Sequence, residues 1–164
     1  MNARWIRLGR IEPAGFELAC ARLAAAQARS AAPILAWAQA EQQYLFTLIA
    51  PRKLAPGRSA RWLSWALAPA VATYRQFDLP AYLDLDGIWL HGRKIAAAGA
   101  QPIGECVVAG SSFLRRFPGS CVATPSHELE QAFRLRLEAQ HGWQFDHSWP
   151  SRPEAVSLAR AELL

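Results

Sequence analysis

Cysteines are few in this sequence, and none is placed as a metal or disulfide site would require. Cys20, Cys106 and Cys121 lie far apart, form no C-x-x-C pair and are odd in number. Such a set is typical of reduced thiols in a cytosolic chain and not of a disulfide framework. The cysteines therefore give no reason to expect a fold stabilised by disulfide bonds.

Long apolar runs and blocks of like charge are also missing. No stretch approaches about 18 uninterrupted apolar residues, so we expect no transmembrane helix. The first ten residues, MNARWIRLGR, contain no apolar run of the length that a signal peptide needs. The net charge of +5 is mild and the arginines are scattered, so we expect no nucleic-acid partner. An anionic small molecule or an acidic protein fits this charge at least as well, and the sequence predicts a soluble, cytoplasmic protein.

The residues that are present suffice for one sizeable core. The chain has 164 residues, of which 52% are hydrophobic, and it includes seven tryptophans. A chain of this length buries about 70% of the surface that it exposes when unfolded. With no repeat, low-complexity tract or linker, we expect a single domain over residues 1–164.

The hydrophobic periodicity predicts strands and helices in mixed order. This order predicts an α+β fold, a mixed, mainly antiparallel sheet packed against helices, and not a doubly wound sheet. The expected elements are an edge strand at 5–8, a helix at 16–28, a hairpin of strands 34–38 and 44–49, a helix at 59–76, several short strands over 82–114, a helix from about 125 to 140, a short strand near 143–145 and a helix at 154–164.

Local signals predict where these helices begin and end. Ser59 is expected to cap the second helix, and Pro69 to kink or interrupt it. Thr124 and the proline after it are typical of a helix start. Gly142 is expected to end that helix, and the spacing of Ser151 and Glu154 is that of a capping box.

The stretch from Tyr82 to Leu114 is read as short strands joined by tight turns. Asp86-Gly87 predicts one turn and Gly92 a second, and Gln101-Pro102 is expected to break a run of small residues at 95–99. Lys94 follows the second turn. A cationic side chain beside a glycine turn, with small residues behind it, suits the approach of an anionic ligand to the backbone.

The pentapeptide GRKIA at Gly92–Ala96 resembles the lysine motif of the biotin/lipoate protein ligase family. The wider order of elements resembles that family too. The segments that carry the resemblance are WIRL, GFELACARLAAAQ, YLFTLIAPRK and GSSFL, followed by two C-terminal helices. The resemblance covers nearly the whole chain and implies the catalytic-domain fold of these ligases.

What the resemblance implies about chemistry concerns the same hairpin. Members of that family make an acyl-adenylate from ATP and biotin or lipoate and pass the acyl group to a lysine of a carrier domain, and others transfer an octanoyl group directly. Lys94 would then point at the acyl carboxylate and phosphate, as the catalytic residue. Gly92, Arg93 and Asp86 would contribute with it to ligand binding. A compact ammonium can offset negative charge developing on those oxygens.

Three departures separate this chain from the family pattern. No glycine occurs between Gly15 and Gly57, so the arginine- and glycine-rich loop that holds the acyl-adenylate is absent. Gly87 stands seven residues before Lys94, where the family has an aspartate, and Asp86 is one residue early. Ala97 stands where the family usually has a glycine.

Other reactive residue types offer weaker alternatives. Asp84 and Asp86 alternate with leucines, which is more typical of the solvent-exposed face of a strand than of a metal site. The four histidines show no paired metal-ligand spacing, and we expect no metal. Cys106 has no evident histidine partner, and Gly110-Ser111-Ser112 lacks the G-x-S-x-G nucleophile elbow.

We therefore expect a diverged biotin/lipoate ligase-like protein that does not adenylate an acid by itself and acts as a binding or partner module. One alternative is an active lipoyl, octanoyl or biotinyl transferase whose loop is supplied by a second ligase subunit. Another is a structural or assembly module. The first two readings imply a lipoyl or biotinyl carrier domain as partner, and the active enzyme would use ATP with lipoate or biotin.

Overall fold

The computed structural model describes residues 1–162, with side chains described through residue 159. Nine strands, four α-helices and two short 3-10 helices follow one another along these residues. They are β1 (Asn2–Arg10), α1 (Pro13–Ala25), β2 (Ile34–Gln39), β3 (Gln43–Pro51), η1 (Arg52–Leu54), η2 (Ser59–Arg61), α2 (Trp62–Gln76), β4 (Tyr82–Asp84), β5 (Gly87–Leu90), β6 (Arg93–Ala97), β7 (Gly99–Ile103), β8 (Cys106–Leu114), α3 (Ser126–His141), β9 (Gln144–Ser148) and α4 (Arg152–Glu162).

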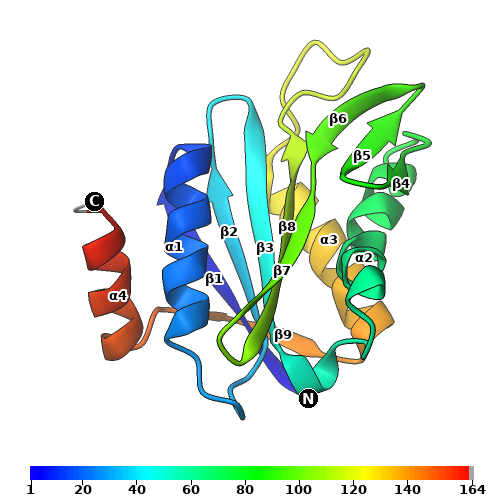
Figure 1. Ribbon diagram of the computed structural model, residues 1–164. Coiled ribbons are helices and arrows are strands. Elements are labelled where there is room, and N and C mark those ends of the chain that lie inside the picture. Colours follow the sequence, from blue (N-terminus) through cyan, green and yellow to red (C-terminus); the bar gives the residue numbers. More distant parts are fainter. Residues whose placement is uncertain (163–164) are drawn as a thin grey trace.

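The strands form two sheets (Figure 1). The larger has six strands in the order β7-β8-β3-β2-β1-β9, and the smaller is an antiparallel set, β4-β5-β6. In the larger sheet β1 runs parallel to β2 and β9, while the β2–β3, β3–β8 and β7–β8 pairs are antiparallel. The expected α+β fold with a mixed, mainly antiparallel sheet is therefore confirmed.

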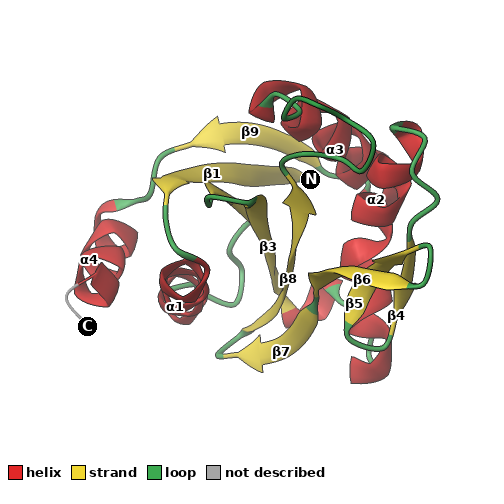
Figure 2. Ribbon diagram, turned by 90° about the horizontal axis from the view of Figure 1, so that it is seen from above, coloured by secondary structure: helices red, strands yellow, loops and turns green. Residues whose placement is uncertain are grey.

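Helices cover both faces of the six-stranded sheet. Figure 2 shows α1 and α4 on one face and α2 and α3 on the other. Alternating side chains of β2 supply both cores: Leu35 and Trp37 pack in the cluster with α2 and α3, whereas Ile34 and Ala36 pack in the cluster with α1. Every residue of β2 but the last is buried, because the sheet is sandwiched at this strand.

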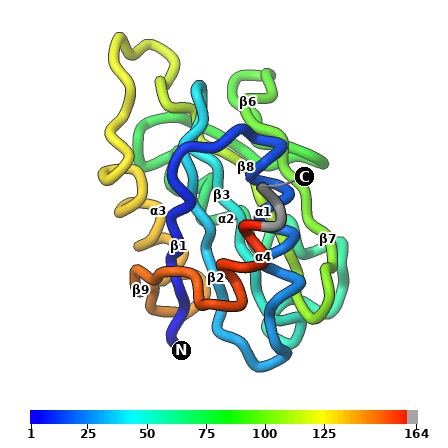
Figure 3. Tube along the Cα trace, turned by 90° about the vertical axis from the view of Figure 1, so that its left-hand side faces the viewer, coloured from blue at the N-terminus to red at the C-terminus, as the bar shows by residue number. Residues whose placement is uncertain are grey.

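The position of β1 differs from the expectation. We predicted an edge strand, but β1 lies inside the sheet between β2 and β9. Figure 2 shows β9 running beside β1, and Figure 3 shows β9 near the N-terminal end of β1. Trp5 and Ile6 face opposite sides and are both almost fully buried. The prediction was wrong because the covering strand, β9, comes from residues about 140 positions later, and a short local pattern carries no sign of such a parallel pairing.

The helix starts were predicted less well than the helix interiors. The first helix begins at Pro13, three residues before the expected start, with proline in its first turn. Neither Ser59 nor Thr124 caps a helix: η2 intervenes before α2, and Pro125 precedes the first helical residue of α3. Pro69 lies inside α2 without interrupting it.

The signals at helix C-termini and the capping box are confirmed. Gly142 ends α3 in the left-handed conformation, with φ of +69°. The backbone N–H of Ser151 donates to Glu154 Oε1 over 2.7 Å, and the N–H of Glu154 donates to Ser151 Oγ over 3.4 Å. Glu154 also accepts a bidentate pair from Arg4, so this cap ties α4 to β1.

The break expected at Gln101-Pro102 is wrong. The chain leaves the small sheet at Ala98 and continues through Pro102 as β7. β7 is the edge strand of the large sheet, where a residue without an N–H is tolerated. No helix within the described residues has the length and apolar character needed to span a membrane.

Candidate functional site

The hairpin that carries Lys94 is well formed and exposed. His91 and Gly92 link β5 to β6 with φ of +50° and +76°, as a two-residue type I′ turn requires. Lys94 Nζ donates to Asp86 Oδ2 over 2.9 Å, and the two side chains are 36% and 68% exposed. The structure thus brings Asp86 and Lys94 together, but as an ion pair in contact with solvent.

Gly87 is what allows Lys94 to reach Asp86. A Cβ built on Gly87 would lie 2.7 Å from Lys94 Cε and 2.7 Å from the carbonyl oxygen of Ala96. The lysine stem lies across the position that any larger residue would need, and the backbone oxygen cannot withdraw easily. The glycine in place of the family's aspartate and the Asp86–Lys94 pair are therefore one coupled arrangement.

This pairing places opposite charges side by side on the hairpin. The hydrogen bond from Lys94 and its charge lower the pKa of Asp86, so the carboxylate is ionised at neutral pH. Gly92 and Arg93 are exposed at the same end of the hairpin. None of these four residues lines the cavity beside β7.

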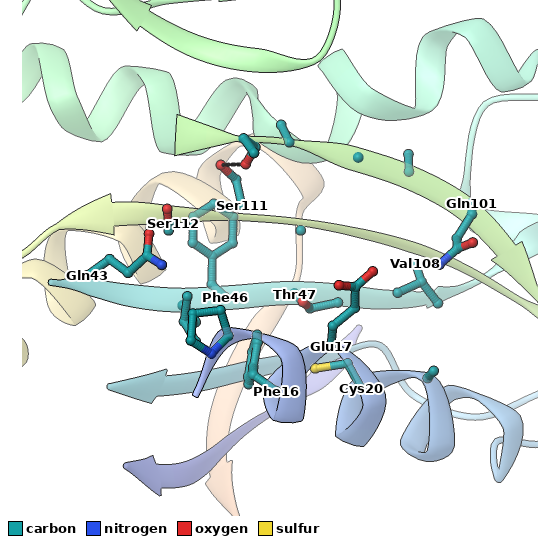
Figure 4. A pocket seen from close by; sticks show the side chains of 18 of the residues that line it. Phe16, Glu17, Cys20, Gln43, Phe46, Thr47, Gln101, Val108, Ser111 and Ser112 are labelled. Carbon is teal, nitrogen blue, oxygen red and sulfur yellow. Dashed lines mark hydrogen bonds between the residues drawn. The ribbon is translucent and has the colours of Figure 1, made fainter. Parts of the chain in front are cut away.

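That cavity lies between α1 and β7, over β3 and β8, and has a volume of about 540 Å³ (Figure 4). It is of the size that small-molecule sites have in other proteins. Its lining is mainly apolar or neutral. The residues are Pro13, Phe16, Glu17, Cys20 and Ala21 at α1; Gln43, Leu45, Phe46 and Thr47 from β3; Ala97, Ala98, Gly99, Ala100, Gln101 and Ile103 around β7; and Val108, Gly110, Ser111 and Ser112 from β8.

The run of small residues at 96–100 is what leaves this space open. Gly99 pairs with Gly110 across the β7–β8 ladder, and residues paired in this way point to the same face. A Cβ on Gly110 would meet Thr47 Oγ1 at 2.6 Å, whereas a Cβ on Gly99 would meet nothing within 4 Å. Gly110 is therefore required by packing, and Gly99 borders empty space on the α1 side of the sheet.

The polar groups of the cavity are mostly uncharged. Gln43 and Gln101 contribute amides from its two ends, and Glu17 projects from α1 toward the strands (Figure 4). Ser111 Oγ donates to the carbonyl oxygen of Ala97 over 2.7 Å, which fixes one wall. Among the described lining residues none is Lys, Arg or His, and Glu17 is the single carboxylate.

The cavity thiol is not an activated nucleophile. Burial raises the pKa of Cys20 to about 12, although a hydrogen bond with Thr47 opposes this, so the thiol is neutral near pH 7. Burial also raises the pKa of Cys106, the cysteine that the sequence offered as a nucleophile. Neither group supports covalent catalysis.

A second, smaller recess lies beside the turn that joins β2 to β3. Arg10, Glu12, Glu41 and Arg115 line it, so its two cations are matched by two carboxylates. Arg115 Nη1 donates to the carbonyl oxygen of Glu41 over 2.9 Å. The turn itself consists of residues 40–42 and is closed by a hydrogen bond from the N–H of Ala40 to Gln43 O.

Sequence reasoning found the small residues of the site but not its location. It connected the run at 95–99 with a ligand, and these residues do border the cavity from Ala97 onward. It missed Glu17, Gln43 and Gln101, which belong to no motif and converge from three separate elements. Within residues 1–162, no three His, Cys, Asp or Glu side chains gather as metal ligands would.

A comparison of the sequence with protein-family models finds no match, and a comparison with curated proteins finds none either. The structure, in contrast, resembles several solved ligases. A bi-partite lipoate protein ligase from Thermoplasma acidophilum, described with its E2 lipoyl domain, superimposes with a TM-score of 0.81 at 10% identity, covering 98% of this chain and 91% of that chain. Lipoate-protein ligase A bound with ATP gives a TM-score of 0.80 at 11% identity, covering 98% and 94%.

Biotin ligases align less closely. The biotin protein ligase from Leishmania major, in complex with biotinyl-5-AMP, gives a TM-score of 0.55 at 12% identity, covering 99% of this chain and 83% of that chain. Likeness at such low identities establishes the fold. The chain has the fold of the biotin/lipoate ligase catalytic domain, and the resemblance seen in the sequence is confirmed at that level.

Proposed function

We propose that the protein is a non-catalytic binding module with the biotin/lipoate ligase fold, which holds a small, largely apolar ligand in the cavity between α1 and β7. The observation that carries the proposal is the separation of this cavity from Lys94. The lysine that the resemblance assigns to acyl activation is paired with Asp86 and lies outside the cavity lining.

Adenylation of an acid makes demands that this cavity does not meet. Negative charge develops on carboxylate and phosphate oxygens, and ligases of any kind need cations or backbone donors aimed at those oxygens. The described lining supplies Glu17 and neutral groups, and the β2–β3 connection at residues 40–42 is too short to wrap a phosphate. The residues present therefore do not fit an acyl-adenylate made from ATP and lipoate or biotin.

Pyrophosphate release tests the catalytic half of this proposal. The purified protein, incubated with ATP and lipoate or biotin, is expected to release no pyrophosphate above a protein-free control. Turnover that disappears in Lys94→Ala would contradict the proposal, because it would show that the lysine acts on a substrate.

Thermal unfolding tests the binding half. Lipoamide, lipoate, octanoate and biotin are suitable probes, and a ligand present at about 100 times its Kd stabilises a fold by about 2.7 kcal/mol. Gly99→Leu is the matched control, since the new side chain would occupy the cavity without meeting any atom at its Cβ. We expect a rise in Tm for at least one probe, and no rise with Gly99→Leu. The absence of any shift would favour a structural or assembly module.

The similarity to a bi-partite ligase from Thermoplasma acidophilum favours a second candidate function. In that reading this chain is an active lipoyl, octanoyl or biotinyl transferase when a second subunit supplies the missing loop, and a carrier domain accepts the acyl group. Lipoylation of an added lipoyl domain that requires both host extract and Lys94 would support it. In either reading the cytoplasmic location expected from the sequence stays a prediction.

A further inference from the structure

We infer that Arg7, Arg134 and His147 form a binding site for a phosphate group, on the face of the sheet opposite the cavity. The three side chains come from β1, α3 and β9, which lie side by side in Figure 2. This site and the cavity would hold different ligands, so the inference goes beyond the proposed function and does not rest on it.

The strand register places Arg7 and His147 on the face of the sheet that α3 covers. Trp5 pairs with His147 across the parallel β1–β9 ladder, and the centroids of the two rings are 6.5 Å apart. Trp5 also meets Phe133 of α3 edge to face. Arg7 lies two residues after Trp5 on β1, so its side chain leaves the strand on the same side.

A buried carboxylate holds the first guanidinium in place. Glu130 Oε1 accepts from Arg7 Nε over 2.8 Å and from Trp5 Nε1 over 3.0 Å. Its Oε2 accepts from Ser126 Oγ over 3.0 Å, so both oxygens are engaged. The side chain of Glu130 is only 8% exposed and that of Arg7 is 53% exposed. Arg7 is therefore anchored through Nε, and its two Nη groups remain available to a ligand.

The second guanidinium is left unpaired by the protein. Arg134 Nε is buried and has no hydrogen-bond partner in the part of the chain whose side chains are described. Glu130, one helical turn earlier, already pairs with Arg7. Buried polar atoms are nearly always hydrogen-bonded, so an orphaned donor needs an explanation. The residue as a whole is only half-buried, and an oxyanion can reach its guanidinium from solvent.

Both guanidinium charges act on the same imidazole. Partial burial is the largest cause that lowers the pKa of His147, and the charges of Arg7 and Arg134 lower it further. Glu130 and Asp146 oppose this shift without reversing it. Two cations thus face one carboxylate on this side of the sheet, since Asp146 alternates with His147 and points to the other side. A bound anion would offset the repulsion and raise the pKa of His147.

A phosphate group fits these donors better than a carboxylate does. Guanidinium groups match the geometry of phosphate oxygens, and charge-assisted hydrogen bonds of this kind are among the strongest in proteins. A phosphate monoester offers three terminal oxygens and nearly two negative charges near neutral pH. It can therefore accept from three elements at once, with a protonated His147 as the third donor. Inorganic phosphate and a phosphorylated side chain share this chemistry.

Calorimetric titration of two probes tests the site and separates the two sources. Inorganic phosphate and N-acetyl-O-phosphoserine amide are titrated at constant ionic strength into the wild-type protein, Arg134→Gln and Arg136→Gln. Arg136 is the matched control, because it is exposed on the same helix and its Nε donates to Gln76 Oε1 over 3.2 Å, away from the site. His147→Gln is a second variant that leaves both arginines of the site in place.

We expect the wild-type protein to bind at least one probe, and Arg134→Gln to weaken that binding about tenfold or more. His147→Gln should weaken it by a smaller factor, and Arg136→Gln should leave it unchanged. Tighter binding of the inorganic probe would identify a free anion as the ligand, and tighter binding of the ester would identify a phosphorylated side chain.

NMR of the histidine rings locates the bound probe. Phosphate should shift the ring signals of His147 and raise its pKa, while the signals of His91, on the β5–β6 hairpin, stay unchanged. Equal losses of affinity in Arg134→Gln and Arg136→Gln would overturn the inference. Unchanged His147 signals, or no binding of either probe, would overturn it as well.

Discussion

The β5–β6 hairpin and the cavity beside β7 meet at Ala97, which ends β6 and lines the cavity, yet they differ in charge and in exposure to solvent. The hairpin carries the recognisable motif, GRKIA, and holds its charges in an exposed ion pair. The cavity carries no motif and brings together neutral groups from three strands and a helix. The residues that resemble a catalytic site are thus not among those that line the cavity.

Gly87 leaves the space in which Lys94 contacts Asp86. Its missing Cβ is the reason that Lys94 can fold back across β5 toward Asp86. An aspartate at this position would displace the lysine. The glycine at this position and the Asp86–Lys94 ion pair therefore depend on each other.

The reactivity of Cys20 offers the largest contrast with an enzyme-like cavity. Since burial raises its pKa from 9.0 to about 12, the thiolate fraction near pH 8 falls roughly a thousandfold below that of an unperturbed thiol. We expect iodoacetamide to label the exposed Cys121 in the folded protein and to leave Cys20 unmodified, as read by peptide mass spectrometry. In urea all three cysteines should react.

The sign of this shift also predicts the pH dependence of stability. A thiol whose pKa is higher in the folded state contributes stability below its unfolded pKa, and that contribution is lost as the pH rises above about 9.

The labelling experiment has a clear contrary outcome. Labelling of Cys20 at a rate similar to that of Cys121 near pH 8 would contradict a buried, neutral Cys20 thiol.

The two paired glycines of the cavity wall should respond differently to the same change. Gly110→Ala places a Cβ against Thr47 Oγ1 and the carbonyl oxygen of Phe46, so it should lower the free energy of unfolding by about 1–3 kcal/mol. Gly99→Ala enters open space and should not destabilise the fold. Urea denaturation of both variants measures the difference, and equal losses would mean that the cavity is not open at Gly99.

Removing the ion pair of the hairpin should have the smallest effect. Lys94→Ala breaks an exposed contact, and such pairs contribute about 0–1 kcal/mol. Asp86→Asn should have a similar effect, and the double variant should lose no more than either single one. Urea denaturation measures these changes, and a loss well beyond that range would mean that Lys94 has a further role in the structure.

Much of the fold was predictable because its signals are local. The hairpin of β2 and β3, the buried face of α3 and the Ser151–Glu154 capping box each depend on residues close in sequence. The parallel pairing of β1 with β9 joins residues 2–6 to residues 144–148, and no pattern within either segment predicts it.

The cavity was harder to predict for a related reason. Its shape depends on side chains that are absent, at Gly99 and Gly110, and on Glu17 facing strands that are remote in sequence. A motif search finds residues that are present and clustered, so it led to Lys94. Only the register of β7 against β8 shows that the two glycines face the same space.

The most direct test of the proposal that a ligand binds in the cavity and not at Lys94 is to titrate lipoamide, by isothermal calorimetry, into the wild-type protein, Lys94→Ala and Gly99→Leu. We expect the wild-type protein and Lys94→Ala to bind with the same Kd, and Gly99→Leu to lose binding while keeping its Tm. Loss of binding in Lys94→Ala, together with retained binding in Gly99→Leu, would place the ligand at the hairpin and contradict the account.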